Sequence, residues 1–372
     1  MLSRLRIAVV GVGRIGLFHA RHVQEVAAQR GDCELTAVVD GHADLAERAA
    51  AQLQPGQQTP IHVFAAVEEL LGAGVSEAAI VASRTADHPA HTRALVEAGQ
   101  RVLLEKPLAG DLTEARALAA WLEEEGARRQ AVMVAFQRRF DAALCHAREL
   151  VLGGRLGRVF KVVSALEDPL PPPDGYQSPG LLADMAVHNL DEVVWLTGLR
   201  PSFLLGTGAR LHNQLASRVP EDFDDAFLQV WLADDAVAQV VVSRNHVAGY
   251  RNETLVCGSE GHVHVGHFEG EPLQVKVEAY GRGGGVLDWR LFELRDYGSE
   301  VPVFITRFGS AYRAEVEHFV VQCRARRPFA VGHVEGLRAL EVALAGARCL
   351  SSRLQAVPVE YAELPGPQGV GG

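Results

Sequence analysis

Apolar residues in the first third of the chain occur in short runs separated by longer segments with helical periodicity. The apolar runs predict strands at residues 6–10, 34–40, 78–82 and 101–104, and a shorter strand at Val63. The segments between them predict helices at residues 14–28, 43–53, 67–71, 89–98 and 113–125, the last capped by Asp111 or Thr113. Apolar strands that alternate with helices are typical of a doubly wound parallel sheet. We therefore predict an α/β domain over residues 1–129.

After about residue 130 the pattern changes to longer β-type segments joined by turns rich in Gly, Asp and Pro. The predicted strands are at residues 158–166, 203–209, 227–232, 236–244, 253–257, 262–265 and 274–280. Helices are predicted at residues 181–196, 311–327 and 335–351. This order predicts an α+β domain over residues 130–372 with a large, mostly antiparallel sheet. The acidic run 221–225 is interpreted as a solvated turn, 280–285 as a hairpin connection, and the tail from Pro365 as a flexible end.

Composition limits the class and the location of the protein. A chain of 372 residues is long enough for two domains. Its formal net charge of −10 gives no overall basic field for nucleic acid or an anionic membrane. No apolar stretch approaches the roughly 18 residues of a membrane span, and the first residues do not resemble a signal peptide. The five cysteines are scattered singly, which argues against disulfides and zinc knuckles. We expect a cytoplasmic protein with no metal site and no nucleic-acid or membrane partner.

A glycine-rich turn follows the first predicted strand and leads into a predicted helix. In a GxGxxG turn, glycines permit the tight bend, the approach of a pyrophosphate and the close packing of helix and strand. The residues expected at the cofactor are Gly11, Gly13, Arg14, Ile15 and Gly16. Asp40 ends the next strand, where its carboxylate would accept hydrogen bonds from ribose hydroxyls and repel a 2′-phosphate. The pattern predicts a Rossmann domain that binds NAD.

A charged pair, Glu105-Lys106, follows the strand predicted at residues 101–104. Ligands of open α/β sheets bind beyond the carboxyl ends of the strands, so we expect both residues near the cofactor and Lys106 near the nicotinamide. Pro107 disfavours a helical conformation at Lys106. A surface ion pair between Glu105 and Lys106 is the alternative interpretation.

The helix predicted at residues 181–196 is apolar around most of its circumference, which indicates burial. Asp184 and His188 are four residues apart and share a face of this helix. We interpret His188 as a general base stabilised by Asp184, although Asp191 could be the partner instead, and a purely structural pair is a further alternative. Lys106 would stabilise the developing alkoxide while hydride moves to NAD.

Several segments resemble the Gfo/Idh/MocA oxidoreductases, and within them the inositol 2-dehydrogenases. GVGRIGLFHARHV (11–23) resembles the opening motif of the family, and LLEKPLAG (103–110) resembles its EKP motif. The segment EDPLPPPDGYQSPGLLADMAVHNLD (167–191) resembles the stretch that carries the functional Asp and His of these enzymes. The resemblance extends to about residue 350. Asn189, in place of the usual Asp, and Ser178-Pro179-Gly180, in place of SGG, are departures that bear on the identity of the substrate.

The resemblance implies specific roles and a reaction. It makes Lys106, Asp184 and His188 catalytic residues, and it adds Asp168 and Tyr250 to them as substrate-binding residues. The implied reaction is NAD-dependent oxidation of a secondary hydroxyl on a cyclic polyol, with conversion of myo-inositol to a 2-keto-inositol as the main expectation. A sugar substrate and a non-catalytic NAD sensor are the alternatives. Related enzymes associate through an open sheet face, which implies a homodimer or a homotetramer.

Overall fold

The computed structural model describes residues 3–169, 179–210, 222–268, 273–352 and 357–363. The chain forms two compact units. The first contains the chain up to Phe136 together with Tyr312–Leu337, and the second contains Gln137–Ala311 and Arg338–Tyr361. The sequence predicts a single boundary near residue 129. In the structure, the first unit also contains the later segment Tyr312–Leu337. The tail expected from Pro365 lies outside the described residues.

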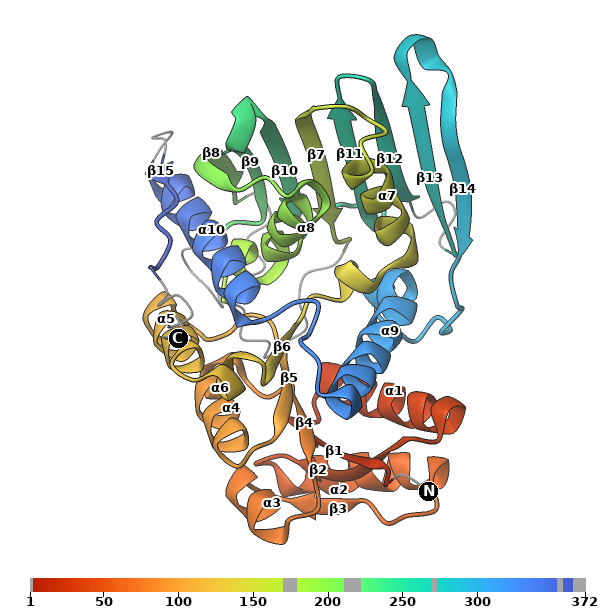
Figure 1. The fold of residues 1–372 in the computed structure, drawn as a ribbon, viewed down its shortest axis with the longest axis vertical. Helices are drawn as coiled ribbons and strands as arrows, with labels where there is room; N and C mark the ends of the chain where they lie inside the picture. The colour runs from red at the N-terminus through yellow and green to blue at the C-terminus, as the bar shows by residue number, and fades with distance from the viewer. Residues whose placement is uncertain (1–2, 170–178, 211–221, 269–272, 353–356, 364–372) are drawn as a thin grey trace, which may run out of the picture. The chain divides into compact units, whose positions relative to one another are not determined.

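The first unit is built on a six-stranded parallel sheet in the order β3-β2-β1-β4-β5-β6 (Figure 1). Its strands are β1 Leu5–Val10, β2 Cys33–Val39, β3 His62–Phe64, β4 Ala78–Val81, β5 Arg101–Glu105 and β6 Val132–Ala135. The central strands are fully buried because helices cover both faces, which is why they read as continuous apolar runs. The predicted doubly wound Rossmann sheet is confirmed, with β6 as an additional strand at one edge.

The helices of the first unit follow the strands in alternation. They are α1 Arg14–Arg30, α2 Ala43–Leu53, α3 Val67–Ala73, α4 His88–Glu97, α5 Leu112–Glu123 and α6 Gly126–Arg129, with short 3-10 turns at Gln54–Gly56 and Thr85–Asp87. Helix α5 resolves the choice between two predicted caps. The carboxylate of Asp111 accepts a hydrogen bond of 2.9 Å from the backbone N–H of Glu114, so Asp111 is the N-cap.

The second unit is built on a nine-stranded sheet in the order β14-β13-β12-β11-β7-β10-β9-β8-β15. Its strands are β7 Val159–Glu167, β8 Pro201–Ala209, β9 Asp225–Leu232, β10 Val237–Ser243, β11 Arg251–Gly258, β12 Gly261–Phe268, β13 Gln274–Gly281, β14 Val286–Glu293 and β15 Val357–Pro358. Strands β7 and β10 pair in parallel, and the other pairings of the described strands are antiparallel. The predicted, mostly antiparallel sheet is confirmed, as is the hairpin connection after Tyr280.

Helices of the second unit cover one face of this sheet, as Figure 1 shows for α7 and α8. The helical segments are η3 Gln137–Phe140, α7 Ala142–Leu152, the π-helical η4 Leu182–Ala186 and α8 Val187–Thr197, with short turns η5 Ala233–Asp235 and η6 Arg282–Gly284. The unit boundary falls inside both α9 Val303–Ala325 and α10 His333–Ser351. Along β9, buried and exposed residues alternate, so the sheet has a covered face and an exposed one.

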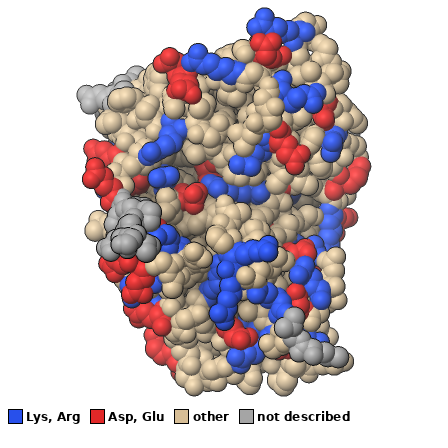
Figure 2. Space-filling view, in the orientation of Figure 1, with Lys and Arg blue, Asp and Glu red and all other residues tan. Residues whose placement is uncertain are grey.

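The surface carries charges of both signs. On the face drawn in Figure 2, Lys and Arg side chains are interspersed with Asp and Glu side chains on both units. Among the described helices, none combines the length and the apolar character that a membrane span requires.

Candidate active site

The three glycines of the predicted cofactor turn differ in their surroundings. Gly11 has a φ of 84°, and a Cβ atom there would lie 2.5 Å from the Cα of Ser83. A Cβ atom on Gly16 would lie 1.8 Å from the carbonyl oxygen of Gly11, so helix α1 could not pack this closely on β1. A Cβ atom on Gly13 would meet nothing within 4 Å. Packing therefore requires the first and third glycines, and the space beside Gly13 fits the approach of a pyrophosphate.

The backbone and Asp40 complete this cofactor site. Helix α1 starts at Arg14, so Arg14, Ile15 and Gly16 form its first turn, and no side chain caps it. The N–H groups at such a helix start suit phosphate oxygens. Asp40 directly follows β2, and its two carboxylate oxygens accept hydrogen bonds of 3.0 Å from the N–H groups of Val12 and His42. The carboxylate is thereby held beside the glycine turn, with acceptor capacity remaining for ribose hydroxyls.

Glu105 ends β5 and points into the first unit. Its Oε1 lies 2.7 Å from Nε2 of His19 on α1, and its Oε2 accepts a 3.2 Å hydrogen bond from the backbone N–H of Lys106. The side chain of Glu105 is buried and contacts His19 and the backbone of Lys106, which argues against the alternative of a surface ion pair with Lys106. Lys106 follows at the carboxyl end of the strand, and the Lys106–Pro107 peptide bond is cis. Glu105 therefore positions the backbone from which Lys106 projects.

Two further buried groups bear on this segment, and the sequence contains no signal for either. The imidazole of His88 lies 2.8 Å from the carbonyl oxygen of Pro107 and 3.1 Å from that of Ser83, and burial lowers its pKa. The carboxyl group of Glu315 on α9 is completely buried. Burial raises its pKa well above the usual value, and the charge of Glu105 raises it further. No local pattern marks Glu315, because its environment is created by residues far away in the chain.

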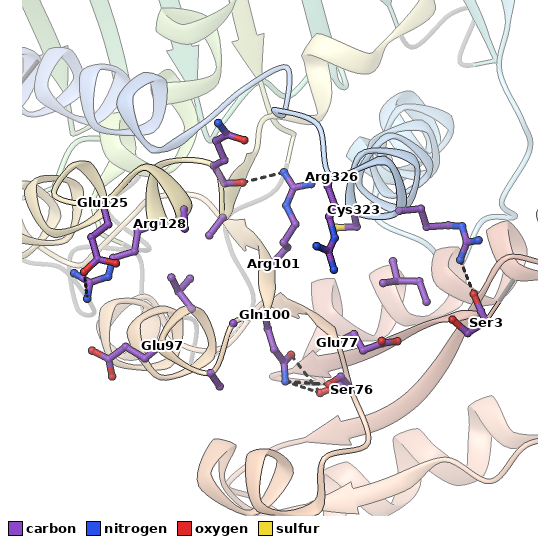
Figure 3. A pocket seen from close by; sticks show the side chains of 18 of the residues that line it. Ser3, Ser76, Glu77, Glu97, Gln100, Arg101, Glu125, Arg128, Cys323 and Arg326 are labelled. Carbon is purple, nitrogen blue, oxygen red and sulfur yellow. Dashed lines mark hydrogen bonds and ion pairs between the residues drawn. The ribbon is translucent and has the colours of Figure 1, made fainter. Parts of the chain in front are cut away.

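A hollow in the first unit lies at the amino-terminal ends of the parallel strands, opposite the glycine turn and Lys106 (Figure 3). Arg101, which begins β5, donates hydrogen bonds to the carbonyl oxygens of Gln322 and Arg327 at 2.6 and 2.7 Å. Arg324 donates to the carbonyl oxygens of Ser3 and Asp32. These guanidinium groups tie chain segments together, so we assign the hollow no role in the chemistry.

In the second unit, the predicted substrate residues lie at the ends of central strands of the sheet. Asp168 directly follows β7, and its N–H donates a 2.9 Å hydrogen bond to the carbonyl oxygen of Ser243, the last residue of β10. Tyr250 immediately precedes β11, which pairs with β7. Burial raises the pKa of the Tyr250 phenol, and the negative charge of Asp168 raises it further. The structure therefore brings Asp168 and Tyr250 together.

The predicted catalytic pair lies on the helix that covers this sheet. Asp184 is within the π-helical segment η4, and His188 is in the first turn of α8. Single π-helical turns inside α-helices are common at functional sites. The carboxylate of Asp184 lies 3.3 Å from Nη2 of Arg244, a buried arginine directly after β10. Sequence reasoning had no signal for Arg244, because only the tertiary structure brings it to Asp184.

The interpretation of residues 221–225 as a solvated turn is wrong for Asp222 and Asp224. Asp224 is buried, and the side chain of Asp222 is only 9% exposed. Oδ2 of Asp222 lies 2.9 Å from Nη1 of Arg244. A run of acidic residues usually indicates exposure to solvent. Here a buried guanidinium needs opposite charge, and Asp222 supplies it.

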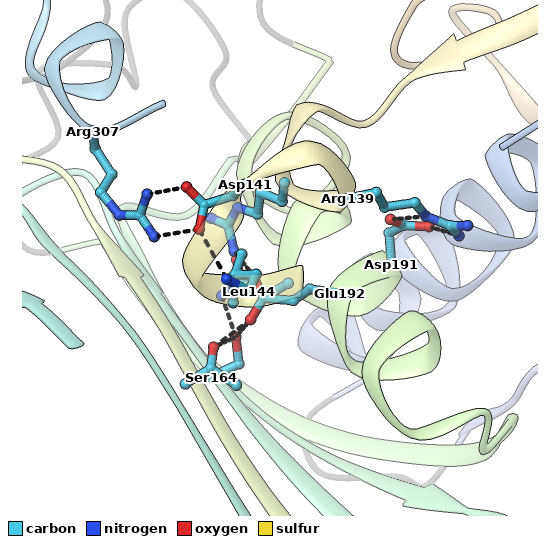
Figure 4. A network of polar contacts seen from close by, with 10 residues as sticks. Arg139, Asp141, Leu144, Ser164, Asp191, Glu192 and Arg307 are labelled. Atoms are coloured by element: carbon cyan, nitrogen blue, oxygen red, sulfur yellow. Dashed lines mark hydrogen bonds and ion pairs between the residues drawn. The ribbon is translucent and has the colours of Figure 1, made fainter. Parts of the chain in front are cut away.

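The alternative partner of His188, Asp191, lies on α8 and belongs to a buried polar network (Figure 4). Its carboxylate accepts two hydrogen bonds from Arg139, at 2.9 and 2.6 Å. Glu192, the next residue, pairs with Arg138 at 2.7 Å. Asp184 and Asp191 thus each have an arginine partner, and the choice between them for His188 stays a prediction. The expected burial of this helix is confirmed.

The predicted site residues form two groups, one within each unit. The first contains the glycine turn, Asp40, Glu105 and Lys106, and the second contains Asp168, Asp184, His188 and Tyr250. Across the described ranges, no three His, Cys, Asp or Glu side chains gather in a way that could hold a metal ion.

The glycine turn, the parallel sheet and Asp40 define the class of an NAD-binding oxidoreductase. Residues 5–136 match the family model for the oxidoreductase family with an NAD-binding Rossmann fold, GFO_IDH_MocA. Residues 145–264 match the model for the GFO/IDH/MocA C-terminal domain. The chain belongs to the Gfo/Idh/MocA oxidoreductase family, and its cofactor is NAD.

Within this family, the chain is similar to inositol dehydrogenases. It is 33% identical over 318 residues to the myo-inositol dehydrogenase Hyg17 of Streptomyces leeuwenhoekii, covering 85% of this chain and 87% of that protein. It is 27% identical over 349 residues to the scyllo-inositol 2-dehydrogenase (NAD(+)) of Bacillus subtilis, covering 93% and 94%. A crystal structure of a putative myo-inositol dehydrogenase from Sinorhizobium meliloti 1021 matches with a TM-score of 0.78 and 26% identity, covering 96% and 100%. The chain is therefore an NAD-dependent oxidoreductase of the inositol 2-dehydrogenase-like type.

Proposed function

We propose that this protein oxidises a secondary hydroxyl group of an inositol, of the myo-inositol to 2-keto-inositol type, in the cytoplasm. One observation carries the proposal. Asp168 and Tyr250 lie at the ends of central sheet strands in a chain that is similar along most of its length to myo-inositol and scyllo-inositol dehydrogenases, and Asp184 is linked to the same end of the sheet through Arg244. Carboxylates and a phenol offer the hydrogen-bonding groups that a ring of hydroxyls requires.

Each proposed role follows from the chemistry of the side chain. NAD, when bound, accepts the hydride from the carbon that carries the reacting hydroxyl. His188 takes the hydroxyl proton as general base, and Asp184 stabilises the resulting imidazolium. Lys106 donates a hydrogen bond to the reacting oxygen, which becomes the ketone oxygen, and stabilises its developing negative charge. Asp168 and Tyr250 orient the other hydroxyls of the ring.

The Asn189 departure from the family pattern is compatible with this proposal. Asn189 is completely buried, and its Nδ2 donates a 2.8 Å hydrogen bond to the hydroxyl of Ser164 on β7. The side chain is therefore part of the packing between α8 and the sheet. A sugar substrate remains the second candidate, and an NAD sensor without turnover is the third.

The test is NADH formation, followed by absorbance, with purified protein. The panel is myo-inositol, scyllo-inositol, chiro-inositol, glucose and xylose, each with NAD and with NADP. We expect turnover of an inositol with NAD and much weaker turnover with NADP, because the carboxylate of Asp40 repels a 2′-phosphate. Turnover of only glucose or xylose would favour the hypothesis of a sugar substrate. NAD binding without any turnover would favour the hypothesis of an NAD sensor.

Variants on the active substrate test the assigned roles. His188→Ala and Lys106→Met should each lower kcat by about 100-fold or more, in the range of general acid–base and electrostatic catalysis. His264→Ala and Lys276→Met are the matched controls, because these residues lie on β12 and β13 and pair with Glu253 and Glu278. Full turnover by both test variants would show that the assigned roles are wrong.

A further inference from the structure

A buried guanidinium lies beside the proposed catalytic carboxylate. Arg244 is 1% exposed and has two carboxylate neighbours. Its Nη1 lies 2.9 Å from Oδ2 of Asp222, and its Nη2 lies 3.3 Å from Oδ2 of Asp184. A charge this deeply buried needs opposite charge nearby, and the planar fork of arginine fixes the directions in which both carboxylates must lie.

Asp222 also holds the backbone from which Asp184 projects. Both oxygens of its carboxylate accept from the N–H of Leu181, at 2.9 and 3.0 Å. Leu181 immediately precedes the π-helical segment that contains Asp184. Asp222 therefore fixes the start of the helix and the position of Arg244 at the same time.

The guanidinium of Arg244 donates to Oδ2 of Asp184 and so restricts the rotation of this carboxylate. We propose that Arg244, anchored by Asp222, is a positioning residue that holds the Asp184 carboxylate in its catalytic orientation. This inference rests on the proposed function of Asp184 and His188.

A purely structural role of Arg244 is the competing explanation, and Arg307 provides a matched control. Its side chain is also completely buried and pairs with Asp141, at 2.6 and 3.1 Å. Neither Arg307 nor Asp141 belongs to the helix that carries Asp184. If burial of an ion pair were all that mattered, changes at Arg244 and Arg307 would have similar effects.

The first experiment compares Arg244→Gln, Arg244→Lys and Asp222→Asn with Arg307→Lys, on the substrate identified by the panel. Loss of positioning should lower kcat by roughly 10- to 100-fold in Arg244→Gln, because small displacements of a catalytic group are costly. Arg244→Lys should recover part of the loss, and Asp222→Asn should lower kcat in the same direction. KM should change less than kcat, and the Kd for NAD should stay the same. Arg307→Lys should reduce the thermal midpoint with little change in kcat.

Backbone hydrogen exchange supplies a second readout that needs no turnover. In protein without substrate, Arg244→Gln and Asp222→Asn should speed exchange in residues 181–188, and Arg307→Lys should not. Unchanged exchange there, or a kcat loss equal to that of Arg307→Lys, would overturn the positioning role. If the unmodified protein oxidised no polyol, the proposed function would fail, and exchange would still decide whether Arg244 and Asp222 hold this segment.

Discussion

At the scale of single residues, Glu315 shows how burial alone changes a carboxyl group. It lies on α9, completely buried, and neither side-chain oxygen has a hydrogen-bond partner among the described residues. Burial raises its pKa well above the usual value, and the nearby charge of Glu105 raises it further. The carboxyl group is therefore held neutral at a pH at which an exposed glutamate is ionised.

Glu315→Gln tests this state through the pH dependence of stability. The folded pKa is above the unfolded one, so the stabilisation from the bound proton is complete below the unfolded pKa and is lost as pH rises through the folded pKa. Glutamine has a similar shape and does not titrate. The variant should therefore gain stability relative to the unmodified protein as pH rises above about 4, the usual range for glutamate. Thermal unfolding from pH 4 to 8 measures this difference, and a difference independent of pH would contradict it.

At the scale of elements, the sequence predicted the helices, strands and turns that have a recognisable local pattern of residues. The glycine turn, the apolar strands of the first sheet and the helix with Asp184 and His188 all have such a pattern. Edge strand β14 was missed because both of its faces are largely exposed, so it has no alternation of polar and apolar residues. Strand β6 was missed although it is a short apolar run like β4, and α9 begins eight residues earlier than predicted.

The candidate site divides in the same way. Lys106, Asp184 and His188 were predicted because they lie in recognisable motifs. Arg244, Asp222 and Glu315 were missed, because only the tertiary structure brings each of them close to the charged groups around it. Buried charges of this kind follow from the packing of distant segments, which single-sequence patterns do not report.

The cap of helix α5 provides a test at this scale. Asp111→Ala should lower the free energy of unfolding by about 1 kcal/mol, because it leaves the N–H of Glu114 without its acceptor. Thr113→Ala is the matched control, since Thr113 was the alternative cap and lies inside the first turn of α5. Urea unfolding followed by circular dichroism measures both. A larger loss from Thr113→Ala would mean that the cap is wrongly assigned.

At the scale of the whole molecule, the exposed face of the nine-stranded sheet carries large apolar side chains. Phe203 and Trp231 are cross-strand neighbours on β8 and β9, and they are 50% and 38% exposed. Phe227 on the same side of β9 is 51% exposed. Exposed apolar patches of this kind mark protein interfaces. We propose that this face binds a second copy of the chain, in a homodimer or a homotetramer.

Light scattering at micromolar concentration tests the assembly. We expect an oligomer, and the double variant Phe227→Ser and Trp231→Ser should shift the mass to smaller species. Leu152→Ser is the control, because Leu152 is equally exposed but lies at the end of α7, on the covered side of the sheet. A monomeric unmodified protein would refute the proposal.

The later segment of the first unit has a consequence for synthesis on the ribosome. The N–H of Val134 on edge strand β6 donates to the carbonyl oxygen of Val331, Met133 bridges to Gly332, and Glu123 pairs with His333 at 2.8 Å. These partners leave the ribosome only after the whole of residues 137–311, a delay on the order of ten seconds at typical rates of translation. During that interval the nascent chain exposes an unpaired sheet edge, which is a template for aggregation. Synthesis of the cofactor-binding unit therefore begins first, yet the edge of its sheet is covered late.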